Sequence, residues 1–153
     1  MRKLIFIPIL ALFFYLCEYA LYNWFGAIFK PNLLLLFIIF FSLSFGIRIG
    51  IYTAVVAGVI QDCFSIGIFG TNIFVNVACA YFVVLLTRYW YQRGSNIFRL
   101  QLISVMVVFH VVLTFCLHFM IVNVQLSTMI GHILVPELIS TLLVTSFIFN
   151  SLK

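Results

Sequence analysis

Charged residues are scarce in this sequence. Asp, Glu, Lys and Arg together make up 7% of the 153 residues, and only three residues are acidic. Soluble domains carry about 25% charged residues, and hydrophobic residues reach 66% here, so a soluble domain is excluded. The apolar runs are about 20 residues long, which matches the hydrocarbon thickness at helical rise. Because these runs lack the alternation that a transmembrane barrel needs, the sequence predicts an all-α polytopic membrane protein.

Sequence motifs of catalysis and metal binding are also missing. The four cysteines lie in apolar runs without CxxC or paired spacing, so neither a disulfide framework nor a metal site is predicted. The sequence contains no HExxH, GxSxG, Walker or glycine-rich phosphate motif. We therefore predict a protein that is not an enzyme and has no catalytic residues, no bound metal and no cofactor.

The apolar runs predict six spans in one transmembrane domain, residues 1–153. The first run follows Arg2 and Lys3 but is too long for a signal peptide, and no cleavage site follows it, so we interpret it as a retained span. Pro31 is well placed in the first turn of the second helix. The predicted spans are residues 4–22, 32–45, 49–64, 71–87, 100–122 and 132–150.

The formal net charge of +5 does not indicate nucleic-acid binding, because the basic residues are scattered singly at predicted helix ends. With six spans both termini lie on one side, and seven of the eight basic residues fall there. The positive-inside rule then predicts cytoplasmic termini. The residues on the terminal side are Arg2, Lys3, Arg48, Arg88, Arg93, Arg99 and Lys153, and Lys30 falls opposite.

The segment from Gly46 to Asn72 combines small residues with polar ones. Gly46, Gly50, Ala54 and Gly58 recur every fourth residue, a pattern that lets another helix backbone approach closely in lipid. Asp62 continues this spacing, so we expect it to point into protein. A carboxylate at membrane depth costs about 2.5–3.5 kcal/mol on insertion scales and needs a partner, water or a proton. We interpret the segment as a close-packed hub with a polar end.

The predicted topology places the acidic and amide side chains in the outer half of the bilayer. This gradient favours a polar pocket or a partner-binding surface that opens outward, and mutual hydrogen bonding between these groups is the structural alternative. The residues are Glu18, Gln61, Asp62, Asn72, Asn76 and Glu137.

Three polar residues share one face of the fifth predicted helix: His110, Thr114 and His118. Together with a carboxylate they could form a proton relay of the kind that transporters use. Hydrogen bonding of these histidines to the backbone is the simpler interpretation.

Two stretches resemble the signature of the rod shape-determining protein MreD family. KPNLLLL opens the second helix, and GVIQDCFSIGIFGTN spans the end of the third and the following turn. In that family a Pro-Asn or Pro-Asp begins an apolar helix, and a Gly-x-x-x-Asp and a Ser-x-x-x-x-Gly-like turn follow. The matching positions here are Pro31, Asn32, Gly58, Asp62, Ser65 and Gly70. Chain length, six-span hydropathy and the basic loop from Arg88 to Arg99 also fit.

The resemblance implies a non-enzymatic subunit of the bacterial elongation machinery in the cytoplasmic (inner) membrane. Such a protein pairs with an MreC-like single-span partner and helps couple cytoplasmic MreB filaments to periplasmic wall synthases. It also implies a fold like that of the S-components of energy-coupling-factor vitamin transporters. A small-molecule-binding transporter subunit is therefore the alternative function, and self-association into a homo-oligomer is left open.

Overall fold

The computed structural model describes residues 2–26, 29, 31–65, 68–90, 96–122 and 135–151. These residues are helical apart from short connections, and none of them forms a strand. Predictions that concern Lys30, Arg93, Lys153, the connector 123–131 and the start of the predicted span 132–150 lie outside this part. The helices are α1 (Arg2–Phe25), α2 (Leu33–Phe45), α3 (Ile47–Phe64), α4 (Thr71–Trp90), α5 (Asn96–Val122) and α7 (Val135–Ser151).

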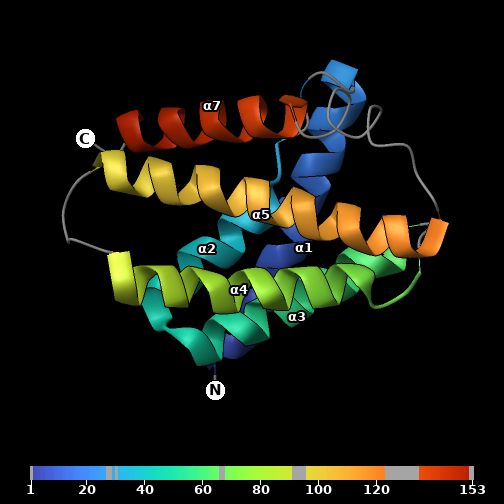
Figure 1. Cartoon of the computed structure of the whole chain (residues 1–153), viewed down its shortest axis with the longest axis horizontal. Helices are drawn as coiled ribbons and strands as arrows, with labels where there is room; N and C mark the ends of the chain where they lie inside the picture. Colours follow the sequence, from blue (N-terminus) through green and yellow to red (C-terminus); the bar gives the residue numbers. More distant parts are fainter. Residues whose placement is uncertain are drawn as a thin grey trace.

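The helices form one bundle in which α4, α5 and α7 run in alternating directions, and α1 crosses them steeply (Figure 1). Figure 1 shows α4, α5 and α7 side by side, with the end of α4, the start of α5 and the end of α7 on the same side. α3 packs against α1, α2 and α4, and α7 packs against α5. The bundle therefore places the α3–α4 turn and the start of α7 away from the C-terminal end.

Helix length and composition confirm the prediction of an all-helical membrane protein. Within the described residues, three helical stretches are long and apolar enough to cross a membrane: Phe6–Phe25, Ile47–Phe64 and Thr71–Arg88. The shorter apolar stretches are Leu33–Phe45, Gln101–Leu117 and Val135–Thr145. That each of the six helices crosses the bilayer stays a prediction.

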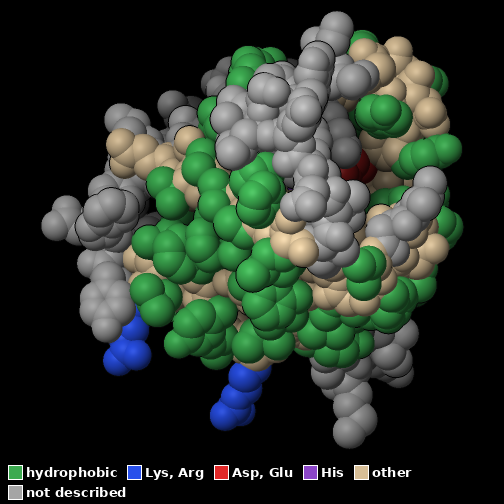
Figure 2. All heavy atoms as spheres, turned by 45° about the vertical axis from the view of Figure 1, so that its right-hand side comes forward, with side chains coloured by type: hydrophobic (Ala, Val, Ile, Leu, Met, Phe, Trp, Pro, Cys, Tyr) green, Lys and Arg blue, Asp and Glu red, His purple; other side chains and the backbone are tan. Residues whose placement is uncertain are grey.

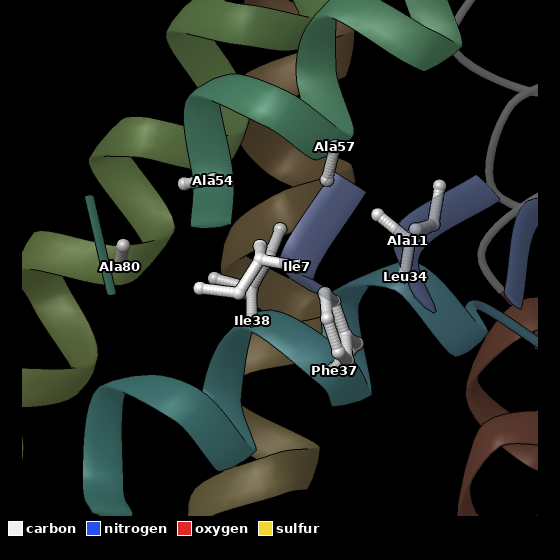
Figure 3. Close-up of a cluster of buried hydrophobic side chains, with 8 residues drawn as sticks. All are labelled: Ile7, Ala11, Leu34, Phe37, Ile38, Ala54, Ala57 and Ala80. Carbon is white, nitrogen blue, oxygen red and sulfur yellow. The ribbon is translucent and has the colours of Figure 1, made fainter. Parts of the chain in front are cut away.

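α2 lies at the centre of the bundle. Its Leu34, Phe37 and Ile38 pack with an isoleucine and four alanines of α1, α3 and α4 in one cluster, which Figure 3 shows. Its Leu35 and Ile39 belong to a second cluster, formed with α4 and α5. Alanines at the crossings keep the first cluster compact, because their short side chains let helix backbones approach. The α1, α3 and α4 members of the first cluster are Ile7, Ala11, Ala54, Ala57 and Ala80.

α2 is also short for a membrane-crossing helix. Its 13 residues extend about 20 Å at helical rise, whereas the hydrocarbon core is about 30 Å thick. Pro31 and Asn32, which precede it, are buried. The start of α2 therefore lies inside the protein, and the interior must supply partners for its free backbone groups.

The outside of the bundle is strongly apolar. Large hydrophobic side chains are exposed on all six helices, for example Phe13 on α1 and Leu143 on α7. On the face in Figure 2, hydrophobic side chains cover much of the described surface, and basic side chains project from one end. Such a surface suits lipid, where exposed apolar side chains cost nothing.

Candidate functional site

The crossing of α3 and α4 depends on one glycine. A Cβ added at Gly58 would overlap the Cα of Ile73 and lie 2.8 Å from its backbone nitrogen. These are backbone atoms of α4, so they cannot move aside as the end of a side chain can. Only glycine therefore allows this approach, which brings the end of α3 against the start of α4.

The other small residues that we predicted to share this face behave differently from one another. A Cβ at Gly50 would overlap Oγ of Ser42 on α2, and Ala54 is fully buried. Gly46 lies outside the helix, between α2 and α3, with φ of 80° and nothing within 4 Å of an added Cβ. The predicted packing role does not hold for Gly46, which instead supplies a left-handed conformation that other residues rarely adopt.

Asp62 holds the start of α4. Its carboxylate accepts hydrogen bonds from the backbone N–H groups of Gly70 (2.8 Å), Asn72 (3.1 Å) and Ile73 (3.3 Å), and from Nδ2 of Asn72 (2.9 Å). The first N–H groups of a helix have no partner within it, and a negative charge there is favourable. The buried carboxylate and the free end of α4 therefore satisfy each other.

The residues between α3 and α4 explain why this cap comes from another helix. Gly70 precedes α4 at the N-cap position, where Ser, Thr, Asp or Asn would usually provide the acceptor. Its φ of 102° favours glycine, and glycine has no side chain to offer. Ser65 ends α3 in an extended conformation. Asp62 thus provides the acceptor that a capping side chain at position 70 would otherwise provide. Because Asp62 belongs to α3, these bonds join the end of α3 to the start of α4.

One turn further along α4, an amide pair continues the contact. Nδ2 of the buried Asn76 donates to Oε1 of Gln61 at 2.7 Å. Gln61 and Asp62 of α3 thus each bind one asparagine of α4. We refer to Gln61, Asp62, Asn72 and Asn76 as the α3–α4 polar contact.

A second group of polar residues surrounds the buried start of α2. Asn32 caps that helix, because its Oδ1 accepts from the N–H of Leu35 at 2.9 Å. Its own N–H donates to Oγ1 of Thr141 at 3.1 Å, and its Nδ2 donates to Oε1 of Glu137 at 2.8 Å. Asn32 therefore joins α2 to α7 with three different polar atoms in use.

α5 reaches the same carboxylate through a histidine. Nδ1 of His110 lies 3.4 Å from Oε1 of Glu137, and both residues are buried. Glu137 lies in the first turn of α7, where a negative charge is favourable, and Pro136 suits the helix start before it. We call Asn32, His110, Glu137 and Thr141 the Glu137 cluster.

The six residues that we predicted to form one polar pocket thus lie in different places. Four make up the α3–α4 polar contact, and Glu137 belongs to the second cluster with Asn32. Glu18 is half-buried on α1.

Sequence analysis missed the pairing of Asn32 with Glu137, which are 105 residues apart. The only local signal was that Glu137 and Thr141 share a helix face. It raised a relay of His110 with a carboxylate only as the alternative to backbone bonding, and the carboxylate of Glu137 lies 3.4 Å from Nδ1 of His110.

An all-helical bundle with an apolar exterior and polar contacts at its helix ends defines an integral membrane protein. The family model of the rod shape-determining protein MreD matches residues 1–150. The chain therefore belongs to the MreD family, a family of rod shape-determining membrane proteins. No individual curated protein and no solved structure matches it in the same comparisons.

The structure gives a physical role to most of the residues that carry the family resemblance. Asn32 caps α2, Gly58 permits the helix crossing and Asp62 caps α4. Gly70 supplies the turn, and Ser65 ends α3. These residues set where helices begin, end and cross.

Proposed function

We propose that this protein is a non-enzymatic membrane subunit of the cell-elongation machinery. In this role it binds an MreC-like single-span partner and helps couple cytoplasmic MreB filaments to the wall synthases outside. The observation that carries the proposal is the match of the MreD family over residues 1–150. Its site of action is the bacterial inner membrane, which it crosses several times with both termini in the cytoplasm.

The contacts of the polar residues support a scaffold. The carboxylate of Asp62 accepts four hydrogen bonds from the start of α4. Asn32 forms hydrogen bonds with α2 and with α7. Such contacts fix helices relative to one another, which a protein that presents a constant surface to partners requires. We infer that the α3–α4 polar contact and the Glu137 cluster serve this purpose rather than a reaction.

Depletion of the protein in a rod-shaped host tests the cellular role. We expect cells to become round and an affinity-tagged chain to copurify with an MreC-like protein. Re-expression of the wild-type chain is the positive control, and the Gly58→Leu variant, which cannot form the α3–α4 crossing, should not restore the rod. Depleted cells that stay rod-shaped but lose uptake of one vitamin would instead identify the transporter subunit.

Reporter fusions test the orientation. Fusions after Arg93 and after Lys153 should be active only with a reporter that works in the cytoplasm, because seven of eight basic residues fall on that side. A fusion in the connector 123–131 is the matched opposite control and should be active only outside. Activity of the Lys153 fusion outside the cell would contradict the six-span topology.

A further inference from the structure

His110 and Glu137 are two titratable side chains that are buried against each other between α5 and α7. Nδ1 of His110 lies 3.4 Å from Oε1 of Glu137, and both residues are buried. α5 and α7 lie side by side (Figure 1), and His110 is near the middle of α5. The pair therefore lies far from both ends of this helix. Ionisable side chains inside membrane helices are rare, and they pair with one another or have a specific role.

Few charged groups surround this carboxylate in the described part of the chain. Arg48 and Arg88, the two arginines whose side chains are described, are exposed. The start of α2 contributes uncharged polar groups, and from α4 the buried thiol of Cys79 is within reach of the charge of Glu137. Among the described residues, His110 is therefore the one that can supply a positive charge beside Glu137.

The number of protons on the pair decides its net charge. With two protons the pair is positive, with none it is negative, and with one it is neutral. A net charge is costly in an interior of low dielectric constant. Because two groups this close titrate as a unit, the one-proton form is the stable form of the buried pair.

The surroundings of Glu137 decide which of the two groups holds that proton. Oε1 of Glu137 accepts a hydrogen bond from Nδ2 of Asn32 at 2.8 Å. Glu137 also lies in the first turn of α7, where the free N–H groups of a helix favour a negative charge. Both effects stabilise the ionised carboxylate. The proton therefore belongs on the imidazole of His110.

We propose that His110 and Glu137 form a proton-binding site, which holds one proton as an imidazolium–carboxylate pair and joins α5 to α7 at the start of α2. The ligand is the proton itself, taken up from water. His110 is a positioning residue, because its charge holds the carboxylate that Asn32 also binds. Loss of the proton leaves this carboxylate buried without a counter-charge and weakens the joint. This role is independent of the cellular partners proposed above.

Nitrogen NMR of the full chain in lipid nanodiscs, with isotope-labelled histidine, counts the protons directly. At neutral pH we expect both ring nitrogens of His110 to carry a hydrogen, whereas a neutral imidazole carries one. The signal is assigned through its correlations to the α5 backbone, so no variant has to fold for this measurement. In Glu137→Gln the ring should lose one of its two hydrogens. A wild-type His110 with a bare ring nitrogen at neutral pH would overturn the proposal.

A double-mutant cycle measures whether the two charges act together. His110→Gln leaves the carboxylate without a counter-charge and should raise the equilibrium constant of unfolding in mixed micelles by roughly 100-fold or more. Glu137→Gln should raise it less, because its amide oxygen still accepts from Asn32. The double variant, with two neutral amides, should be at least about tenfold more stable than the product of the single effects predicts. Single effects that simply multiply would overturn the proposal.

A second cycle, His110→Gln with Thr145→Val, is the matched control. Thr145 is also buried on α7, but its hydroxyl donates to a carbonyl of α7 itself at 2.6 Å. The effects of these two substitutions should therefore multiply. Coupling as strong as that between His110 and Glu137 would mean that any disturbance of the α5–α7 contact gives the same result, and would overturn the specific role of the pair.

The pH dependence is a readout that packing alone would not change. Raising the pH until His110 loses its second ring hydrogen should lower the stability of the wild type, because a proton that favours the folded state is then removed. The variant with glutamine at both positions has no such proton and should show no comparable loss over the same range. Equal losses in the two proteins would overturn the proposal, since another group, such as the thiol of Cys79, would then be responsible.

Discussion

Replacing Asp62 by asparagine should destabilise the α3–α4 turn although the side chain keeps its shape. The carboxylate accepts four hydrogen bonds, two at each oxygen: Oδ1 binds Asn72 twice, and Oδ2 binds the N–H groups of Gly70 and Ile73. An amide offers one acceptor and one donor. Its NH₂ group would face two N–H donors in place of Oδ2, so two of the four bonds are lost.

The magnitude follows from the number of bonds and their exposure. The net worth of one hydrogen bond to a charged group is about 1.5–3 kcal/mol, and these bonds are partly buried, which reduces their value. We expect Asp62→Asn to lower the free energy of unfolding by about 2 kcal/mol and Asp62→Leu, which loses all four bonds, by about 4 kcal/mol.

Thermal unfolding and protease resistance in detergent measure the effect, with Gln61→Ala as the matched control. That variant loses one bond to Asn76 on the same helix pair and should cost about 1 kcal/mol. An Asp62→Asn protein as stable as the wild type would refute the view that the carboxylate caps α4. An Asp62→Leu protein no less stable than Gln61→Ala would refute it as well.

Further substitutions distinguish the roles of the glycines and of Asn32. Gly58→Ala should destabilise the fold by about 1–3 kcal/mol and more than Gly50→Ala, because its new Cβ overlaps backbone atoms of Ile73, whereas the overlap at Gly50 is with Oγ of Ser42; equal thermal stabilities would contradict this. Gly70→Ala should cost about 1–2 kcal/mol from its positive φ alone, since nothing lies within 4 Å, and an unchanged melting temperature would disprove that strain. Asn32→Ala should lose the cap of α2 at a cost of about 1 kcal/mol plus the bonds to α7; protease cleavage confined to the C-terminal part is the expected readout, and uniform resistance would count against it.

The α3–α4 turn was largely predictable from the sequence because its determinants are close together. Asp62 lies eight residues before Gly70 and ten before Asn72, and the family signature covers the same stretch. A buried carboxylate and a helix that starts without a capping side chain each need a partner, and the chain between them is short. Local physical requirements therefore specify this contact.

The Glu137 cluster and the position of α2 could not be derived in the same way. Asn32 and Thr141 are 109 residues apart, and no local pattern indicates which of several helices packs beside a given one. The α2 sequence LLLLFIIFF is apolar on every side, so it shows neither that two of its faces are buried nor that it is central. Gly46 was misassigned because a four-residue spacing does not reveal whether its first member lies in the helix or ends it.

A common principle connects the two polar sites. α2 begins inside the protein and α4 begins half-buried against the end of α3, and each receives an acceptor for its free N–H groups: Asn32 for α2, and Asp62 of α3 for α4. An unsatisfied backbone group in lipid costs several kcal/mol, so these acceptors determine where each helix can start. Because Asn32 also binds α7, the start of α2 is at once a cap and an attachment point. A scaffold built in this way has its fixed points where caps and backbone crossings coincide, in α2, α3 and α4.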